Sequence, residues 1–385
     1  MRTTATVLMA AACAVALAQP SRPLRPDWPQ PIVKGEVVMW SGAEGKVEAR
    51  KQFIARAQER SILVVSSSAD TARKEWSEVE SAKVVSHFEA DDLERVEALW
   101  VDSSGSGQQS LAPKVVEFKN GGGLVGLPKS VYESAYSEVL PYLNGPGVEF
   151  QLEKNSALVA VGRFLRGAGE GQATITIEGV AEKITIDRRR TRDLIAIRRQ
   201  AIDATLPKFP VKKTPVVENG SLMIVGGGGL PAGMVERFIE LAGGEDAKIV
   251  YVPCSFEEEI TSEPGFVRLL RARGAKNVTW IHTKDRVKSD TDEEFLLPLK
   301  EATGVWFGGG RQWNLVDSYM DTQAHELMRD VLKRGGIIGG SSAGASIQAE
   351  FLARGDPLGN RNILAPGYLR GLGFLPGAAV DQHFS

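Results

Sequence analysis

Four short apolar runs in the second half of the sequence alternate with helical patterns, and this alternation constrains the fold more than any other feature. The runs cover residues 221–225, 248–252, 304–307 and 336–338, and the intervening segments 234–241 and 323–333 have helical spacing of apolar residues. Strands that alternate with helices form a mostly parallel sheet covered on both faces. We therefore predict an α/β, three-layer αβα fold, with any ligand at the carboxyl edge of the sheet.

The last of these runs leads into a sharp turn that carries a serine. Gly340, Ser342 and Gly344 have the G-x-S-x-G spacing of a nucleophile elbow, in which the flanking glycines avoid clashes in the tight turn. The pattern predicts a turn from strand into a helix that continues through residues 346–352. Ser342 would be the nucleophile, with the amide of Ala343 pointing at the oxyanion. The alternative is a structural serine in a glycine-rich loop.

A serine hydroxyl needs a base, and this chain offers few histidines. His87, His282 and His325 lie outside any recognisable motif, which favours surface or packing roles for them. His383 follows an apolar run at 378–380 and is the best candidate for the general base. The histidines are scattered and have no carboxylates at ligand spacing, so no metal site is expected.

The charge balance gives no reason to expect a nucleic-acid partner. The formal net charge is −2, with 46 Lys and Arg against 48 Asp and Glu. A local run of arginines at 188–192 is interpreted as the solvated start of a helix over 191–205. A glycine cluster at 226–229 is interpreted as a tight strand-to-helix turn, because position 232 is Ala and a dinucleotide fingerprint needs a glycine in that register.

The first residues predict export. One arginine, an apolar stretch over 7–17 and the sequence Ala-Leu-Ala at 16–18 are typical of a signal peptide over 1–18, with a periplasmic or extracellular mature protein. The apolar stretch is too short to be a transmembrane segment. Lipidation at Cys13 is the second alternative. After cleavage Cys254 is the only thiol left, and we interpret it as a buried structural cysteine rather than a reactive one.

The first half repeats the plan of the second. Residues 36–42 align with 221–227, 61–66 with 248–253, 98–101 with 304–307, and 122–126 with 335–339. This alignment places Lys129 opposite Ser342, so the first copy has lost its nucleophile. We expect a degenerate domain over 31–180 with antiparallel strands at 155–177 as its edge hairpin, a helix and linker over 181–215, and a catalytic domain over 216–385.

Several of these motifs together resemble the cyanophycinase and dipeptidase E group of serine peptidases. The likeness covers residues 222–385. It depends on Gly-Ser-Ser-Ala-Gly-Ala at 340–345 and on 373–377 leading to Asp-Gln-His-Phe at 381–384. The glycine turn at 226–229 and the pair Gly309 and Gly310 before Gln312 add to it. Within this group, the Asp-Gln-His-Phe form resembles cyanophycinase more than dipeptidase E.

The resemblance implies a flavodoxin-like sheet related to class I glutamine amidotransferases and a serine exopeptidase that cleaves Asp-containing peptide or isopeptide bonds. Ser342 would be the nucleophile and His383 the base, with no cofactor or metal. The residues implied for the oxyanion site are Ala343, Gly309 and Gly310, and those implied for substrate binding are Gln312, Asp381, Gln382 and Arg311. The partners implied are an Asp-containing peptide or isopeptide substrate, for which cyanophycin is one alternative, and a second copy of the chain as an open alternative.

The chain departs from the family pattern at two points. Arg311 stands where the family usually has an aspartate, which changes the substrate charge that the site tolerates. The family's acid is a glutamate from a later segment that would follow Ser385, so we expect the printed sequence to be a fragment or a prematurely ended form of a longer protein. The first copy keeps a trace of that segment at 153–157, with Lys154 in the place of the acid.

Two other functions remain open. A non-catalytic envelope module, in which both copies bind acidic peptides or partners, would fit a chain without a complete triad. An α/β-hydrolase esterase shares the G-x-S-x-G motif, but it needs an aspartate between serine and histidine at long spacings, and Asp356 and Asp381 are the only aspartates there.

Overall fold

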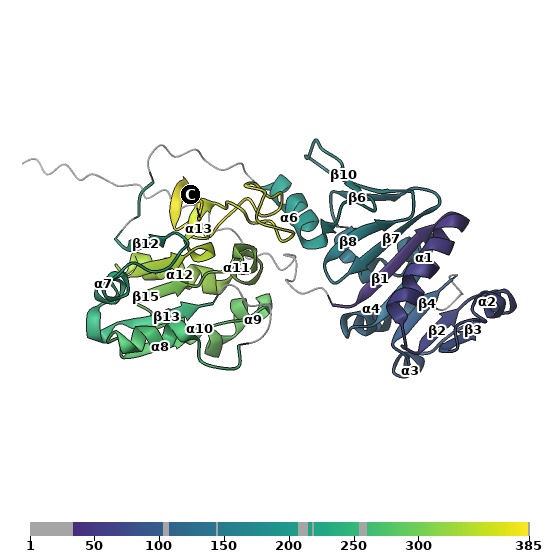
Figure 1. Ribbon diagram of the computed structural model, residues 1–385, viewed down its shortest axis with the longest axis horizontal. Helices are drawn as coiled ribbons and strands as arrows, with labels where there is room; N and C mark the ends of the chain where they lie inside the picture. The colour runs from purple at the N-terminus through teal and green to yellow at the C-terminus, as the bar shows by residue number, and fades with distance from the viewer. Residues whose placement is uncertain are drawn as a thin grey trace, which may run out of the picture.

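The protein is described by a computed structural model that covers residues 34–102, 108–143, 145–206, 215–217, 219–253 and 260–383. The expected signal peptide, Cys13, Cys254 and most of the linker lie outside these residues. The described chain forms two α/β lobes, with the first half on the right of Figure 1, the second half on the left and helix α6 between them.

An eight-stranded sheet organises the first half, in the order β11-β8-β7-β1-β5-β4-β2-β3. Its strands are β1 (Glu36–Ser41), β2 (Ile62–Val65), β3 (Ala82–Val85), β4 (Ala98–Val101), β5 (Leu124–Pro128), β7 (Ser156–Val161), β8 (Phe164–Ala168) and β11 (Arg192–Asp193). The five strands from β1 to β3 in this order are parallel, whereas β7, β8 and β11 are antiparallel additions beyond β1.

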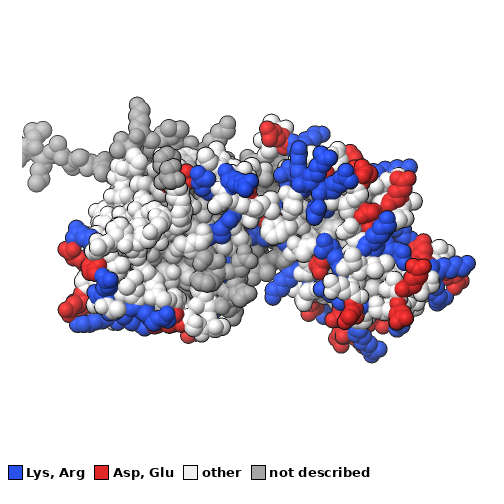
Figure 2. Space-filling model, in the orientation of Figure 1, with Lys and Arg blue, Asp and Glu red and all other residues white. Residues whose placement is uncertain are grey.

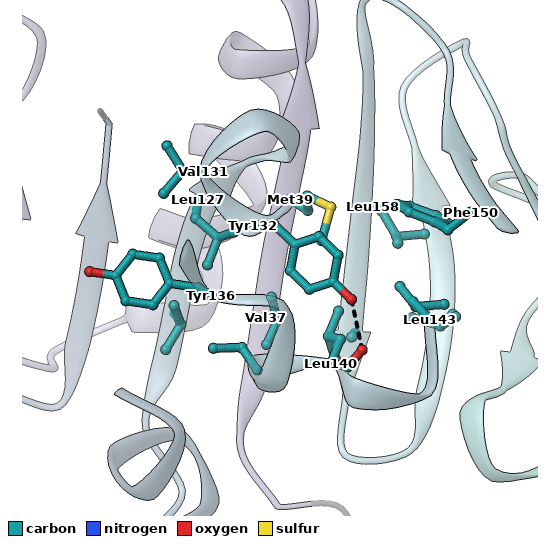
Figure 3. Packing of buried hydrophobic residues seen from close by; sticks show 14 of the residues in the cluster. Val37, Met39, Leu127, Val131, Tyr132, Tyr136, Leu140, Leu143, Phe150 and Leu158 are labelled. Carbon is teal, nitrogen blue, oxygen red and sulfur yellow. Dashed lines mark hydrogen bonds between the residues drawn. The ribbon is translucent and has the colours of Figure 1, made fainter. Parts of the chain in front are cut away.

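Two apolar cores cover the two faces of this sheet. One core contains residues of α1 (Gly42–Ala57) and α2 (Ala69–Glu75). The other contains residues of α3 (Ala90–Leu93), α4 (Ala112–Asn120), α5 (Lys129–Ala135) and a three-stranded sheet of β10 (Ile184–Ile186), β9 (Ala173–Ile177) and β6 (Val148–Leu152). In the second core the buried Tyr132 donates from its hydroxyl to the carbonyl of Leu140 at 2.8 Å (Figure 3), so its one polar atom is satisfied.

The second half has a five-stranded parallel sheet in the order β12-β16-β15-β13-β14. Its strands are β12 (Ser221–Val225), β13 (Lys248–Val252), β14 (Asn277–Trp280), β15 (Gly304–Phe307) and β16 (Ile337–Ser341). One face is covered by α7 (Met234–Leu241) and α8 (Gly265–Ala272), and the other by α10 (Glu293–Glu301), α11 (Gln312–Tyr319) and α12 (Gln323–Lys333). The remaining elements are α9 (Arg286–Thr291), α13 (Ala343–Ser346), β17 (Ala349–Phe351) and β18 (Leu375–Ala379). The predicted α/β architecture with parallel strands is therefore confirmed.

The five parallel strands follow the same spatial order in both sheets, β1-β5-β4-β2-β3 and β12-β16-β15-β13-β14. The packing is also alike: Phe53 meets Trp100 edge-on at 5.1 Å, and Phe238 meets Trp306 edge-on at 5.0 Å. In each half this aromatic pair packs against a glycine of the neighbouring strand, where a Cβ would clash with both rings. The register also agrees, because Pro128 pairs with Trp40 as Ser341 pairs with Val225, which brings Lys129 and Ser342 to equivalent positions.

Three local predictions were wrong. The run 188–192 does not start a helix, because the Asp187 carboxylate accepts hydrogen bonds from the amides of Arg189 and Arg190 and holds a turn. Helix α6 (Leu194–Thr205) begins later, where Asp193 caps it through the amide of Ala196 at 2.7 Å. The helix after Ser342 is a single turn, and residues beyond it form β17, which pairs with β18.

The predicted edge hairpin is also placed differently. Strands β7 and β8 form a hairpin, but β7 pairs with β1 inside the sheet, and β9 belongs to the separate three-stranded sheet. Lys and Arg side chains gather on the face in Figure 2 around the region where Figure 1 places β10, and the arginine turn at 188–190 that follows this strand is exposed. No helix in the described part of the chain is both long and apolar enough to span a membrane.

Candidate active site

The elbow forms where β16 ends at the carboxyl edge of the second sheet. Ser342 has φ 55° and ψ −116°, outside the regions that most residues adopt, and its amide donates to the carbonyl of Val225 at 2.9 Å. Strained backbone of this kind is concentrated at functional sites. The flanking glycines are required by packing: a Cβ at Gly340 would lie 2.3 Å from the carbonyl oxygen of Gly344, and one at Gly344 would lie 2.2 Å from that of Phe307.

The structure brings His383 to this serine. The Oγ of Ser342 and the Nε2 of His383 are 2.7 Å apart, which is hydrogen-bonding distance for a hydroxyl and an imidazole nitrogen. His383 itself has φ 56° and lies beyond β18. A histidine at this distance can accept the serine proton when its Nε2 is unprotonated.

Gly227 makes room for the histidine ring. A Cβ at this position would lie 1.8 Å from both Cε1 and Nδ1 of His383, much closer than any real contact. The glycine cluster at 226–229 is therefore more than the turn that the sequence indicates. The sequence shows these glycines but not which of them faces the ring, since the contact joins the turn after β12 to the distant segment after β18.

The segment that carries His383 is anchored to the short helix behind Ser342. The buried hydroxyl of Ser346 lies 2.8 Å from the carbonyl of Val380 and also contacts the side-chain oxygen of Gln382. The amide of Gly377 donates to Glu350 at 2.5 Å. Sequence reasoning missed Ser346, whose only signal is a small polar residue inside an otherwise apolar run.

Gly309 lies beside Ser342 in the structure. A Cβ built on Gly309 would be 3.5 Å from the Cβ of Ser342, so the turn between β15 and α11 borders the elbow. Ala343 follows Ser342 as the first residue of α13 and is buried. Gly310 adopts φ 135°, a conformation that favours glycine. The predicted oxyanion residues therefore border Ser342, and their role stays a prediction.

The four predicted substrate-binding residues differ in burial and in the contacts that they make. Gln312 is buried and donates from its side chain to the carbonyls of Ala353 and Arg354 at 2.6 and 2.9 Å, and Gln382 is buried against Ser346. Arg311 donates to the carbonyl of Asp356 at 2.5 Å. These contacts hold the loop after β17 beside the start of α11. Contact with substrate stays a prediction for all four residues.

Asp381 remains near the surface beside His383. Its carboxylate makes a bidentate ion pair with Arg354 at 2.6 and 3.0 Å, and the hydrogen bond from this guanidinium lowers the pKa of Asp381 below its usual value. The carboxylate therefore stays ionised near neutral pH. Its charge is engaged by Arg354 rather than by the imidazole.

No carboxylate hydrogen bond to His383 occurs among the residues that the structure describes, so the acid of the triad stays a prediction. The same described ranges contain no group of three or more His, Cys, Asp and Glu residues that could hold a metal ion. The arrangement places a serine hydroxyl, an imidazole and backbone amides close together, and their roles as nucleophile, base and oxyanion donors stay predictions.

The corresponding edge of the first half has a cavity of about 490 Å³ instead of a nucleophile. Lys129, at the position equivalent to Ser342, makes an ion pair with Glu133 at 2.5 Å. Lys46 on the facing wall pairs with Glu75 and Asp102 at 3.0 and 2.9 Å. The lysines are thus neutralised by carboxylates, and no serine–histidine pair occurs among the residues of this edge that the structure describes.

Comparison with known proteins assigns the second half to a family. The model of peptidase family S51 matches residues 222–385. The chain is 30% identical over 153 residues to the cyanophycinase of Geminocystis herdmanii (strain PCC 6308), covering 39% of this chain and 56% of that protein. It is 26% identical over 191 residues to the cyanophycinase of Trichormus variabilis, covering 47% of this chain and 63% of the relative.

A solved peptidase from an acI-B1 Actinobacterium aligns with 43% of this chain and 68% of its own, at 22% identity and a TM-score of 0.33. The chain spans 56% to 63% of the length of the two curated relatives named above. The fold is α/β, and the family match of residues 222–385 supports a peptidase. Within that class the matches support the cyanophycinase and dipeptidase E-like family, peptidase family S51, so the family predicted from the sequence is confirmed.

Proposed function

We propose that this protein is a serine-type exopeptidase that hydrolyses Asp-containing peptide or isopeptide bonds through an acyl-enzyme on Ser342. The observation that carries the proposal is the 2.7 Å contact between Ser342 and His383 at a strained elbow on the carboxyl edge of a parallel sheet. The family match of residues 222–385 supports the peptidase class.

The proposed reaction has two halves. His383 takes the proton of the Ser342 hydroxyl as the oxygen attacks the substrate carbonyl, and the amide of Ala343 with an amide of the Gly309–Gly310 turn stabilises the oxyanion. The protonated imidazole then gives its proton to the leaving amine, which departs as the carbonyl re-forms. Water, activated by the same histidine, hydrolyses the ester and regenerates the serine.

The substrate preference is proposed from the family and from the charges near the site. The curated relatives are cyanophycinases. Arg311 and Arg354 lie on segments that flank the site, and both guanidinium groups make contacts within the protein. The charge of Arg311 would repel a cation placed beside it, so a substrate with an acidic or neutral group at that place should be cleaved faster than one with arginine there.

The experiment is hydrolysis by the purified chain and by Ser342→Ala. We expect the chain to release products from Asp-Xaa dipeptides, from β-Asp-Arg or from cyanophycin, and the variant to lose this activity. Ser341→Ala is the matched control, because Ser341 is the neighbouring serine at the end of β16 and keeps the elbow glycines. Retained hydrolysis in Ser342→Ala would overturn the proposal.

A non-catalytic envelope module is the second candidate. It is favoured by the absence of a carboxylate on His383 within the described ranges and by the ion-paired Lys129 in the first half. Such a module would bind acidic peptides without cleaving them. A serine-directed fluorophosphonate distinguishes the two, because only a working nucleophile reacts at Ser342.

We also propose that the two halves arose by duplication and that the protein is exported. The duplication is supported by the shared strand order, the shared register and the aromatic pair over a glycine in each half. The proposed domains are 31–180 and 216–385, joined by residues 181–215. Export through the signal peptide over 1–18 is tested by sequencing the N-terminus of the mature protein.

A further inference from the structure

A buried ionic network joins the two halves of the chain at helix α11. Its centre is Asp317, whose side chain is 0% exposed. The carboxylate accepts a hydrogen bond from Arg163 of the first half at 2.7 Å and from Arg199 of the connecting helix α6 at 3.0 Å. The hydroxyl of Tyr368, from the second half, lies 2.9 and 3.1 Å from its two oxygens.

Arg163 contacts α11 at two places. It occupies the turn between β7 and β8, where Asp193 holds its guanidinium through bonds of 2.5 and 3.0 Å. The same guanidinium lies over the ring of Trp313 at 4.7 Å. Trp313 and Asp317 are four residues apart and so share one face of α11. A rigidly held arginine of the first half thus contacts one face of this helix along a full turn.

Helix α6 connects the two cores around this network. Its Ile195 is buried in the core of the second half, whereas Leu194 and Ile197 are buried in that of the first half. The loop at 365–368 packs closely on it, since a Cβ at Gly367 would lie 2.3 Å from the carbonyl oxygen of Ala196. The halves therefore meet through a packed interface at α6, which lies between the two lobes in Figure 1.

Two arginines and two aspartates form the centre of the network, and the buried Arg286 of α9 also donates to the backbone carbonyl of Asp317. The burial of each ion is compensated by its charged and hydrogen-bonding partners. Burial opposes the charge of Arg163, but Tyr368, Asp317 and Asp193 together raise its pKa well above its ordinary value, so it remains a cation. Loss of one member leaves an uncompensated buried charge, which displaces its neighbours.

The other end of α11 borders the candidate active site. The helix begins at Gln312, directly after the glycine turn that lies beside Ser342. Asp317 is five residues further on, about 7.5 Å along the axis. Gln312 also holds the carbonyl of Arg354, whose guanidinium pairs with Asp381, two residues before His383. All eight residues of α11 are buried, so the helix is packed against its surroundings along its whole length.

We propose that Asp317 is a positioning residue: Arg163 of the first half and Arg199 of α6 hold α11 through it, and α11 in turn holds the Gly309–Gly310 turn against Ser342. The degenerate first half then has a role in the reaction of the second half without contacting substrate. This inference rests on the proposed function of Ser342 for its catalytic consequence.

The test compares two ion pairs that both cross between the halves. Asp317→Asn removes the charge on α11 with almost no change in shape, and Arg163→Met removes the partner in the first half. Asp203→Asn is the matched control, because Asp203 of α6 pairs with Arg370 of the second half at 3.3 Å and does not belong to α11. Circular dichroism and thermal unfolding identify which variants remain folded at the assay temperature.

Two measurements are made on the folded variants. Amide hydrogen exchange followed by mass spectrometry reports protection of residues 308–320. Fluorophosphonate labelling of Ser342 gives the maximal rate and the half-saturating concentration separately. We expect Asp317→Asn and Arg163→Met to raise exchange in 308–320 and to lower the maximal rate tenfold to a hundredfold, because a displacement of about 1 Å has such an effect. The half-saturating concentration should change little, and Asp203→Asn should match the wild type in both measurements.

Unchanged exchange over 308–320 in Asp317→Asn, or raised exchange with an unchanged maximal rate, would overturn the proposal. An equal fall of the maximal labelling rate in Asp203→Asn would show a general effect of the interface and would also overturn the proposal. If Asp317→Asn fails to fold, Tyr368→Phe removes one hydrogen bond to the same carboxylate and is read in the same way. A wild-type chain that does not react at Ser342 overturns the proposed function, and the exchange data then still decide whether Asp317 holds the turn.

Discussion

Replacement of Gly227 by alanine should disable the catalytic pair without unfolding the protein. The new Cβ would lie 1.8 Å from Cε1 and Nδ1 of His383, whereas ordinary contact begins at 3.4 Å. The ring must therefore retreat by about 1.6 Å, the difference between these two distances. The 2.7 Å contact to Ser342 would then exceed hydrogen-bonding distance in most directions of movement.

The expected loss of reaction rate follows from this displacement. A misplacement of about 1 Å lowers rates by about a hundredfold, or about 3 kcal/mol in the barrier. We therefore expect Gly227→Ala to react with a fluorophosphonate at least about a hundredfold more slowly than the wild type. Because position 227 is exposed and its φ is not in the left-handed region, the free energy of unfolding should change by less than about 1 kcal/mol.

Gly226→Ala is the control, since the same change at the adjacent glycine meets nothing within 4 Å and its φ is also outside the left-handed region. The rates are measured by intact mass over time, at one probe concentration for all three proteins. A Gly227→Ala variant that reacts as fast as Gly226→Ala would refute the placement of His383. Equal slowing in both variants would point to the glycine turn rather than to the ring.

Two further predictions concern stability and the anchor of the histidine. Burial lowers the pKa of Lys119, which is 3% exposed, from 10.5 to about 8. Below pH 8 the folded state carries the full cost of this charge, and between pH 8 and 10.5 the unfolded state binds more protons, so stability should rise with pH. Lys119→Met should stabilise the chain at pH 7 by at most about 3 kcal/mol and by much less at pH 10, as measured by urea denaturation; an equal gain at both pH values would contradict this. Ser346→Ala removes the buried hydroxyl that bonds the segment before His383, which should cost about 1–3 kcal/mol of stability and slow fluorophosphonate labelling. Labelling at the wild-type rate in the folded Ser346→Ala variant would show that this anchor does not position the histidine.

Much of the second half could be predicted because local signals mark its boundaries. The strands at 221–225, 248–252 and 304–307 and the helices at 234–241 and 323–333 have the predicted bounds. Each of these strands is a short apolar run that ends at glycine or proline, and each helix has an unbroken apolar stripe. Local sequence therefore determines both the type and the end of these elements.

The elements that were mispredicted depend on distant partners or on one side chain. Residues 349–351 have helical character in sequence, yet they pair with β18, so a contact between distant segments overrides local preference. The arginine run at 188–192 turns because of the carboxylate of Asp187, which a count of charges does not detect.

The residues of the candidate site that belong to local sequence motifs could be predicted. The elbow and the histidine were found from sequence because the G-x-S-x-G and Asp-Gln-His-Phe patterns are local. Gly227 and Ser346 act through contacts with the C-terminal segment, and no local pattern marks them. Asp317 left no local signal, because Gln312, Asn314 and Ser318 of the same helix are also polar and its partners are distant in sequence.

The central claim, that Ser342 is an activated nucleophile, is tested most directly by locating the adduct of a fluorophosphonate. The chain and its Ser342→Ala variant are incubated with the probe, and the modified peptide is identified by mass spectrometry. The account predicts a single adduct on Ser342 in the wild type and none in the variant. A folded wild-type chain without an adduct, or an adduct that persists in Ser342→Ala, would contradict it.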